Sequence, residues 1–362
     1  MSRRDFLAKG SAVAVATGAA AVSAPAIAQS DVIRWRCASS FPKSVDTLFG
    51  TAEFVARRVG QITGGKFQIS VHAAGEIVPP LQVLDAVEKG TIECNHTAPY
   101  YFIGKDPAWA FGTCIPFGLN SRQFNAWWVH GEGEKVYNEF TRQSGVVNLL
   151  CGNTGAQMAG WFKKEIKSVA DLKGLKFRTG GMGGQVLTKL GVVTQQLPAG
   201  EIYSALEKGT IDAAEFTVPA DDEKLGLNKI AKYYYYPGWN EGGAALGFQI
   251  NAKAWDALPE TYRAALHAAT AEANTWMQAR YDAFNPMALK RLVQGGAVLK
   301  AYPQSVMEAC FKANQELIAE TSAKSASFKK ILDHMRAFQR DQQAWFRVAE
   351  ASIDNFMSKQ KF

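Results

Sequence analysis

Two short words of sequence each occur twice in this chain of 362 residues, and they limit its fold strongly. Ala-Gly-Glu-Ile stands at 74–77 and again at 199–202, and Glu-Lys-Gly-Thr-Ile follows at 88–92 and again at 207–211. Each pair of words is typical of a loop that enters a helix, a glycine that ends the helix and a buried strand after it. Because only two copies are present, the repeat predicts two similar α/β lobes and not a solenoid.

Strand and helix patterns alternate around both copies. The first half predicts, in order, strand 32–38, helix 45–59, strand 67–72, helix 81–87 and strand 91–96. The second half predicts short strands and helices in the same alternation, up to residue 214. This order is typical of a parallel sheet with helices on its faces. The stretches 146–151 and 244–251 are expected to be strands that cross between the lobes.

After Asn251 the pattern becomes helical. Long amphipathic helices are expected at 255–283, 303–323 and 328–357. The last of them is apolar on more than one side, so it needs two partners. We expect one partner to be the body of the protein and the other to be a second subunit.

The first residues predict export from the cytoplasm. Arg3 and Arg4, followed by Phe6 and Leu7, resemble a twin-arginine export motif. An Ala-rich apolar run comes next, and Ala26-Ile27-Ala28 offers small residues at the positions that a signal peptidase reads. The run is only weakly apolar, whereas a retained membrane anchor needs about 20 strongly apolar residues. Residues 1–28 are therefore predicted to be a twin-arginine-type signal peptide, and the mature protein is predicted to be periplasmic.

Composition and motifs exclude several classes of function. The net charge is +7, but no Lys/Arg-rich run or basic stripe accompanies it, so we expect no nucleic-acid partner. The five cysteines form no CxxC pair and are expected to be buried free thiols. Neither GxSxG nor HExxH occurs, and the glycines at 180–184 lack the GxGxxG spacing of a dinucleotide loop. The chain is therefore predicted not to be an enzyme.

Five stretches of sequence carry a resemblance to a known family. They are Ala-Gly-Glu-Ile at 74–77, Phe-Gly-Thr at 111–113 with Pro-Phe-Gly-Leu-Asn at 116–120, Leu-Lys-Phe-Arg at 175–178, Ala-Ala-Glu at 213–215 and Tyr-Tyr-Tyr-Pro-Gly-Trp at 234–239. Over residues 31–355 the chain resembles the DctP-like solute receptors of TRAP transporters, and it is most similar to the branch that binds 2-oxoacids and related monocarboxylates such as lactate. The resemblance implies a ligand cleft, delivery of the ligand to TRAP membrane permease subunits driven by sodium, and often a homodimer held by the C-terminal helix.

The expected fold is α/β, a two-lobed periplasmic-binding-protein fold with crossover strands and long C-terminal helices. Residues 29–150 are expected to form mainly the N-terminal lobe, and residues 151–250 mainly the second lobe with crossover strands. Residues 251–362 are expected to pack on both lobes and to form the dimer interface.

The carboxyl ends of the predicted strands supply the candidate site, because ligands of open parallel sheets bind there. Arg178 ends one strand, and its planar guanidinium matches a carboxylate bidentately. The glycines after it let a backbone approach a ligand and open a helix N-terminus, which also favours an anion. Arg178 is therefore expected to bind the carboxylate of a small organic acid.

Glu215 lies at the end of another predicted strand, where a carboxylate would repel an acidic ligand. A ligand ammonium would resolve the conflict, and so would a cation shared between Glu215 and the ligand. The Gln157 amide and the Phe216 carbonyl would complete an oxygen ligand set suited to Na⁺ or Ca²⁺, and Gln249 is a further candidate ligand of the metal. The resemblance implies the metal-bridged arrangement and does not decide between Na⁺ and Ca²⁺.

The remaining candidates for substrate binding surround these two residues in the predicted cleft. Tyr100 and Tyr101 are expected to close over the ligand, Asn153 to hydrogen-bond its oxo or hydroxy group, and Trp239 to form an apolar wall. Gln157, Phe216 and Gln249 are expected to contact the substrate as well as the metal. Members of the 2-oxoacid branch often carry Trp where this chain has Phe216, so a ligand longer than pyruvate stays open.

Two rival functions stay open at the level of sequence. One is a receptor for another organic anion, a dicarboxylate or an aromatic acid, which a second cationic group in the cleft would indicate. The other is a periplasmic sensor subunit whose output is a protein contact through the C-terminal helices.

Overall fold

The computed structural model describes residues 32–361, which form one compact unit. The predicted signal peptide at 1–28 lies outside the described residues. Within the described part of the chain, none of the helices combines the length and the apolar character that a membrane span requires.

The first sheet has five strands in the order β2-β1-β3-β10-β4. Its elements are β1 (Ile33–Ser39), α1 (Asp46–Ile62), β2 (Phe67–His72), α2 (Val83–Glu88), β3 (Cys94–Thr97), β4 (Val146–Asn153) and β10 (Ala245–Asn251). β1 pairs in parallel with both β2 and β3, so the predicted β-α-β-α-β unit is confirmed.

β10 makes this sheet mixed and not purely parallel. It runs antiparallel between β3 and β4, with Gly247 opposite Thr97 and Ile250 opposite Val147. Both predicted crossing stretches therefore lie side by side in the first sheet. The chain leaves this sheet after Asn153 and returns to it at Ala245, so most of the second lobe lies between two neighbouring strands of the first sheet, and β11 (Val298–Ala301) joins the second sheet later.

The second sheet has six strands in the order β11-β9-β5-β8-β6-β7. Its elements are β5 (Gly160–Phe162), β6 (Lys176–Arg178), α5 (Gly181–Lys189), β7 (Val193–Gln195), α6 (Ala199–Glu207), β8 (Ala213–Ala214), α7 (Pro219–Leu225), β9 (Tyr233–Tyr236) and β11 (Val298–Ala301). β6 is parallel to β7 and β8, so the carboxyl ends of β6 and β8 lie at one edge of the sheet.

The repeated words of sequence have one shared role and one different role. Gly90 after α2 and Gly209 after α6 both adopt positive φ, 68° and 73°, which favours glycine at the end of a helix. Ala199 begins α6 directly, whereas residues 74–76 form a turn ahead of α2. The two copies of the repeat therefore have the same structure at the helix ends but not at the helix starts.

The helices outside the two sheets are α3 (Ser121–His130), α4 (Gly133–Thr141), α8 (Ala252–Ala257), α9 (Glu260–Gln294), α10 (Gln304–Lys324), α11 (Ala326–Ala349) and α12 (Ala351–Met357). Short 3₁₀ helices occur at Pro99–Phe102, Pro107–Gly112, Arg142–Ser144, Val169–Leu172 and Leu227–Lys229. The predicted helix 255–283 is in fact α8 followed by the longer α9, and the predicted helix 328–357 is divided at Glu350.

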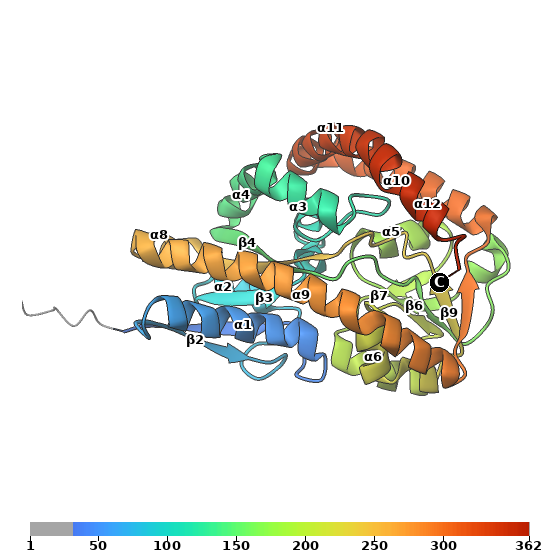
Figure 1. Cartoon of the computed structure of the whole chain (residues 1–362), viewed down its shortest axis with the longest axis horizontal. Coiled ribbons are helices and arrows are strands. Elements are labelled where there is room, and N and C mark those ends of the chain that lie inside the picture. The colour runs from blue at the N-terminus through green and yellow to red at the C-terminus, as the bar shows by residue number, and fades with distance from the viewer. Residues whose placement is uncertain (1–31, 362) are drawn as a thin grey trace, which may run out of the picture. The chain divides into compact units, whose positions relative to one another are not determined.

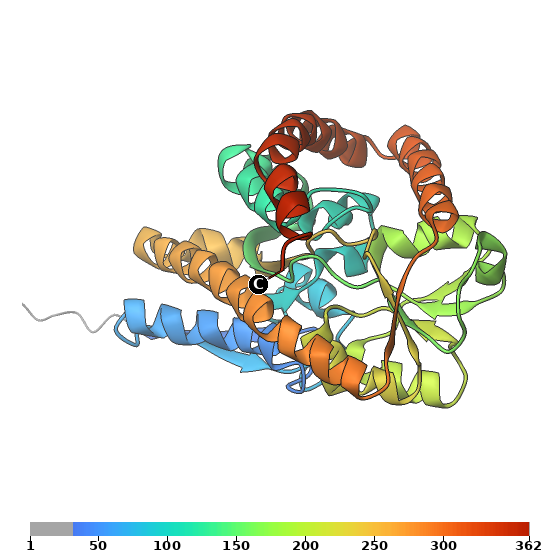
Figure 2. The ribbon, with the colours of Figure 1, turned by 45° about the vertical axis from the view of Figure 1, so that its right-hand side comes forward.

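Helix α9 extends along both sheets, as Figures 1 and 2 show. Its 35 residues span about 52 Å at 1.5 Å per residue. In the first lobe Glu272 pairs with Arg58 of α1, and in the second lobe Arg291 pairs with Glu223 of α7. Pro286 lies inside the helix without ending it.

The apolar core lies in separate clusters on the faces of the two sheets. One cluster packs α1 and α9 against the first sheet and includes Val55, Phe248 and Ala273. Another packs α5 and α10 on the second sheet. All five cysteines are buried free thiols, which confirms the sequence prediction.

Candidate functional site

Backbone hydrogen bonds join three irregular segments beside the carboxyl ends of β6 and β8. The Met158 N–H donates to the Thr217 carbonyl, at 3.2 Å between N and O. The Gln157 N–H donates to the Glu241 carbonyl, and the Gly238 N–H donates to the Gln157 carbonyl, both at 3.2 Å. Gln157 is therefore fixed between the segment that follows β8 and the loop that precedes β10.

Arg178 ends β6 and is fully buried. Its Nε donates to the Leu197 carbonyl at 3.0 Å, and its Nη1 donates to the Glu215 carbonyl. Nη1 also lies 3.6 Å from Glu215 Oε2. Burial by itself lowers the pKa of Arg178, but the neighbouring Glu215 carboxylate raises it above its usual value. Only Nη2 is buried without a hydrogen-bond partner, so one nitrogen and not the whole fork is available to an anion.

Glu215 directly follows β8 and is 1% exposed. Its Oε2 accepts a hydrogen bond from the Thr179 hydroxyl at 3.2 Å, while Oε1 has no partner. Burial raises the pKa of Glu215 to about 7, although the charge of Arg178 opposes this shift. A buried carboxylate oxygen without a donor is costly, and an external cation or proton donor would satisfy it.

Glu241 is the residue that the sequence analysis missed. It is 2% exposed, and neither carboxylate oxygen accepts a hydrogen bond. Burial raises the pKa of Glu241 well above its usual value, and the charge of Glu215 raises it further. The position after Trp239-Asn240 and before Gly242-Gly243 lies in a loop and not at a strand end, so the strand-end rule could not find it.

The first lobe contributes Tyr100 and Tyr101 from the 3₁₀ helix after β3. Their rings stack at 5.0 Å between centroids. Tyr100 adjoins Glu241, whose charge is one cause of its raised pKa, after burial. Burial raises the pKa of Tyr101 to about 12, and the charge of Arg178 opposes this shift. Tyr100, Tyr101, Arg178, Glu215 and Glu241 thus form one group between the lobes, which we call the interlobe cluster.

The glycines after Arg178 begin α5, as predicted, and they also make room for a side chain of the first lobe. A Cβ added to Gly181 would lie 1.9 Å from Tyr100 Cδ2, and one added to Gly180 would lie 2.8 Å from the same ring. Gly181 also has φ 59°, a conformation that strains any other residue. These glycines admit the Tyr100 ring of the first lobe against the start of α5.

Two predicted side chains at the edge of the cluster keep a free polar atom. Asn153 ends β4, and its Oδ1 accepts from the Gly155 N–H at 2.9 Å while Nδ2 is buried without a partner. Gln157 Nε2 donates to the Thr154 hydroxyl at 3.1 Å, which leaves Oε1 buried without a donor. The free atoms are thus one donor and one acceptor.

The other predicted residues divide between wall and core. Phe216 is buried with the Arg178 guanidinium 5.4 Å from its ring centroid. Trp239 is buried and stacks on Phe117 at 5.4 Å between ring centroids. Gln249 lies within the first sheet, where its Oε1 accepts from Asn95 Nδ2 at 3.1 Å. In residues 32–361 no hydrogen bond connects Gln249 to the interlobe cluster, because its place in β10 sets it between β3 and β4.

The unpartnered atoms fit an anion and a hard cation together. Nη2 of Arg178 suits a carboxylate, and the free oxygens of Gln157, Glu215 and Glu241 are the ligand type that Na⁺ and Ca²⁺ prefer. Among residues 32–361, no group of three or more His, Cys, Asp or Glu side chains is arranged to bind a metal by itself. A cation here would therefore need oxygens from the amide, the backbone or the ligand as well.

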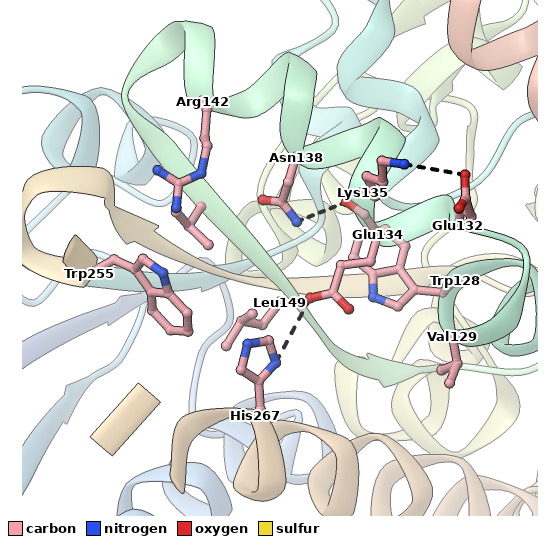
Figure 3. A pocket seen from close by; sticks show the side chains of 11 residues that line it. Trp128, Val129, Glu132, Glu134, Lys135, Asn138, Arg142, Leu149, Trp255 and His267 are labelled. Atoms are coloured by element: carbon pink, nitrogen blue, oxygen red, sulfur yellow. Dashed lines mark hydrogen bonds and ion pairs between the residues drawn. The ribbon is translucent and has the colours of Figure 1, made fainter. Parts of the chain in front are cut away.

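A separate hollow of about 410 Å³ lies on the first lobe between α4, α8 and α9, above β4 (Figure 3). Glu134 Oε1 lies 3.9 Å from His267 Nδ1 across it. An adjoining hollow of about 300 Å³ shares Trp128, Val129 and Leu149 with it. Neither hollow shares a residue with the interlobe cluster, so both are distinct from the candidate site.

Two lobes with buried polar atoms left unpaired between them are typical of a receptor that binds a solute. The comparison of the sequence with protein-family models agrees. The chain belongs to the bacterial extracellular solute-binding proteins of family 7, whose model matches residues 38–325. It is a receptor for transport and not an enzyme, as the sequence predicted, and its resemblance to TRAP solute receptors is confirmed.

Relatives of known name support this placement. The chain is 50% identical, over 99% of both chains, to the monocarboxylate 2-oxoacid-binding periplasmic protein of Nostoc sp. strain PCC 7120. It is 52% identical to a TRAP transporter solute-binding protein of Bordetella bronchiseptica, with a TM-score of 0.89 over 90% of this chain and 97% of that one. That structure is a mixed-occupancy dimer with copurified calcium and picolinate in its active site.

A third relative holds a different cation and a different acid. The TRAP periplasmic solute-binding protein of Pseudoalteromonas atlantica is 36% identical, with a TM-score of 0.87 over 91% of this chain and 99% of that one. Its structure contains sodium and pyruvate. These likenesses confirm the predicted α/β fold with two sheets and long C-terminal helices.

Proposed function

We propose that this protein binds a small 2-oxo or 2-hydroxy monocarboxylate together with a bridging Na⁺ or Ca²⁺ between its two lobes, and delivers the acid to a TRAP membrane permease. One observation carries the proposal. Arg178 Nη2, Gln157 Oε1 and Glu215 Oε1 are buried without hydrogen-bond partners in neighbouring segments of one site. A carboxylate would satisfy the first atom and a cation the other two.

Each residue of the site takes one role. Arg178 Nη2 binds the carboxylate, and Asn153 Nδ2 donates to the oxo or hydroxy oxygen of the ligand. The Tyr100 and Tyr101 hydroxyls close the site from the first lobe. Phe216 forms an apolar wall and offers its backbone carbonyl to the cation.

On the protein side, the Gln157 and Glu215 side chains bind the cation. Trp239 supports the wall through Phe117. Gln249 can offer only its Nε2 amide to the ligand, since its Oε1 accepts from Asn95 inside the first sheet, and it is therefore not included among the ligands of the cation.

The ligands of the relatives share one chemical feature that suits this arrangement. Pyruvate carries a carboxylate beside an oxo oxygen, and picolinate carries a carboxylate beside a ring nitrogen. Both can chelate one cation through two adjacent donor atoms. A site with a cation at Glu215 and a cationic side chain at Arg178 would recognise that pair of donors.

A dicarboxylate receptor is less well supported. Among residues 32–361, Arg178 is the single buried Lys or Arg side chain, so a second carboxylate of the ligand would have no cationic partner of its own. The site therefore favours a monocarboxylate.

Calorimetric titration tests the ligand class. Protein freed of ions with a chelator is titrated with pyruvate, 2-oxobutyrate, 2-oxoisovalerate, lactate and picolinate in buffers containing Na⁺ or Ca²⁺. At least one 2-oxo or 2-hydroxy acid should bind, and succinate should bind more weakly. Absence of binding by all five acids with both cations supplied would contradict the proposal.

We also infer that the mature protein is periplasmic after cleavage of a twin-arginine-type signal peptide near Ala28. The motif at Arg3 and Arg4 supports the export route, and the periplasmic name of the Nostoc relative supports the compartment. Mass spectrometry of the protein from a periplasmic extract should find a new N-terminus at Gln29. Arg3→Lys together with Arg4→Lys should retain the precursor in the cytoplasm.

A homodimer through the C-terminal helices is the last part of the proposal. Every residue of α12 is exposed, including Ile353 and Phe356, and Trp345 and Val348 on α11 are 59% and 70% exposed. The end of α11 contacts its own chain through Arg122, which pairs with Glu350. An apolar face of this extent suits a second copy of the chain.

Light scattering after gel filtration tests the dimer. The unmodified protein should elute as a dimer, and a variant with Trp345→Ser, Val348→Ser and Phe356→Ser should elute as a monomer that still binds ligand. A monomeric unmodified protein would contradict the dimer without affecting the ligand.

A further inference from the structure

Glu241 is held firmly in place although its carboxylate has no partner. Its N–H donates to the Gly238 carbonyl at 3.1 Å, and its carbonyl accepts from the Gln157 N–H at 3.2 Å. The preceding Asn240 packs against Gly183, where an added Cβ would lie 2.8 Å from Asn240 Cβ. The side chain is thus fixed by the loop and not by hydrogen bonds to its own oxygens.

The surroundings of Glu241 contain both the site's cationic group and its other carboxylate. The charges of Glu215 and Arg178 both act on its carboxyl group, and the Tyr100 hydroxyl adjoins it. Gln157, whose Oε1 is also buried without a donor, is bonded to the Glu241 backbone. Four free oxygens therefore lie in this part of the site: one each on Gln157 and Glu215 and two on Glu241.

The total charge of the site determines whether a monovalent or a divalent cation neutralises it. Arg178 contributes one positive charge, Glu215 and Glu241 contribute two negative charges, and a bound monocarboxylate contributes a third negative charge. With both glutamates ionised, as a bound cation would favour, the sum without the charge of the cation is minus two. A divalent cation brings it to zero, whereas Na⁺ leaves one buried negative charge uncompensated, which is costly in a site shielded from water.

Building on the proposed function, we propose that Glu241 is a second carboxylate ligand of the bridging cation and makes the site select a divalent cation such as Ca²⁺ over Na⁺. Ca²⁺ accepts six to eight oxygen ligands, often with one bidentate carboxylate. Glu241, with both oxygens free, can supply that bidentate pair.

A competing role for Glu241 makes an opposite prediction. If its carboxyl stayed protonated, it would donate a hydrogen bond to the organic acid and contribute no charge to the cation. Glu241→Gln would then preserve a donor of similar shape, and the choice of cation would stay as it is in the unmodified protein.

Equilibrium dialysis with ⁴⁵Ca²⁺ separates the two roles. The full chain, freed of metal with a chelator, is dialysed against ⁴⁵Ca²⁺ with pyruvate present, in choline chloride or in NaCl. We expect the unmodified protein to bind Ca²⁺ in both salts. Glu241→Gln should lower the preference for Ca²⁺ over Na⁺ by about tenfold or more, because the lost charge interacts twice as strongly with Ca²⁺ as with Na⁺.

Two control variants test whether a change in cation preference comes from the charge of Glu241. Glu241→Asp keeps the charge and should keep the preference for Ca²⁺, even if binding weakens. Asp221→Asn removes a buried carboxylate of the same lobe outside the interlobe cluster and should leave the preference unchanged. Circular dichroism of each variant identifies any failure to fold.

The possible results also distinguish this proposal from the proposed function. If no organic acid binds with either cation, the proposed function fails. If the acid binds equally well in Na⁺ and Ca²⁺, or if Glu241→Gln keeps the preference of the unmodified protein, the assignment of Glu241 is wrong while the receptor function stands.

Discussion

Two pairs of buried acidic residues lie in and beside the second lobe, and the chain treats them differently. Asp221 and Asp222 begin α7, and three of their four carboxylate oxygens accept hydrogen bonds from the protein. Glu215 and Glu241 have a donor for one oxygen of four. The fold thus supplies the aspartate carboxylates with donors and leaves most of the glutamate oxygens without them, as the proposed binding of a ligand and a cation requires.

Asp222 is the member of the aspartate pair whose two carboxylate oxygens both accept hydrogen bonds. Asp222 Oδ2 accepts from Trp161 Nε1 at 3.0 Å and from the Tyr234 hydroxyl at 2.7 Å, and these two rings stack at 3.9 Å. Asp221 Oδ2 accepts from the Tyr281 hydroxyl of α9 at 2.5 Å. The aspartates therefore tie α7 to the sheet and to α9, and they would serve stability where the glutamates serve binding.

The largest expected effect comes from neutralising a glutamate. Glu215→Gln should weaken Ca²⁺ binding by about a thousandfold or more, since a unit charge 4 Å away contributes about 4 kcal/mol at an effective dielectric constant of 20. The melting temperature without ligand should change little, because the buried charge that is removed is costly by itself but also balances Arg178. Dialysis and calorimetry measure the two quantities. A variant that unfolds yet binds normally when folded would erase the contrast between the pairs.

The second prediction concerns an aspartate, for which we expect a loss of stability and little loss of affinity. Asp222→Ala leaves the Trp161, Tyr234 and Thr217 donors without an acceptor and should lower the free energy of unfolding by about 3 kcal/mol. Urea unfolding without ligand measures this loss. Affinity for the organic acid in the folded variant should change far less than in Glu215→Gln. An undiminished stability would show that the aspartates are not structural.

The third prediction concerns how the glutamates come to be enclosed. Gly181→Ala adds a Cβ into the Tyr100 ring and strains a positive φ, which costs about 1–2 kcal/mol by itself. Closure of the lobes should become less favourable, and affinity for the acid should fall about tenfold. Small-angle scattering with saturating ligand should report a more open particle. Gly200→Ala, where an added Cβ meets nothing within 4 Å, is the matched control.

The smallest effect is a pH dependence of stability. Burial raises the pKa of Asp221 to about 7, above its value in the unfolded chain, so the folded state holds this proton where the unfolded state has lost it. Stability from this group therefore falls as pH rises through the folded pKa, by about 1 kcal/mol between pH 6 and pH 7. Asp221→Asn should remove that part of the slope in urea unfolding across this range. Parallel slopes for both proteins would contradict the shift.

The same contrast explains which residues the sequence could predict. Arg178 ends β6 and Glu215 follows β8, so the strand-end rule could place both residues at the same edge of the second sheet. Glu241 lies in a loop whose burial depends on Gly183 and Gln157 from distant segments, and no local pattern reports such contacts. Gln249 was chosen without knowing which sheet β10 joins, and the antiparallel place of β10 puts it beside Asn95 instead.

The lobes and helices followed from periodicity and from the repeated words, but two features did not. The chain's return to the first sheet at β10 is a long-range pairing that sequence spacing does not encode. The extension of α9 past Pro286 was missed because proline usually ends a helix, whereas here the helix is packed on both lobes.

Helix α9 also has a mechanical consequence for the receptor. It is fastened to α1 through Arg280 and Asp46 and to α7 through Tyr281 and Asp221, which are adjacent positions on one continuous rod. Separating the lobes must therefore flex this rod or detach it from one side. Pro286, which cannot donate a backbone hydrogen bond, lies between these anchors and the Arg291–Glu223 pair, in the part of α9 that is packed on the second lobe. Because both fastenings meet at neighbouring residues of one helix, we expect the loss of either of them to make the lobes easier to separate.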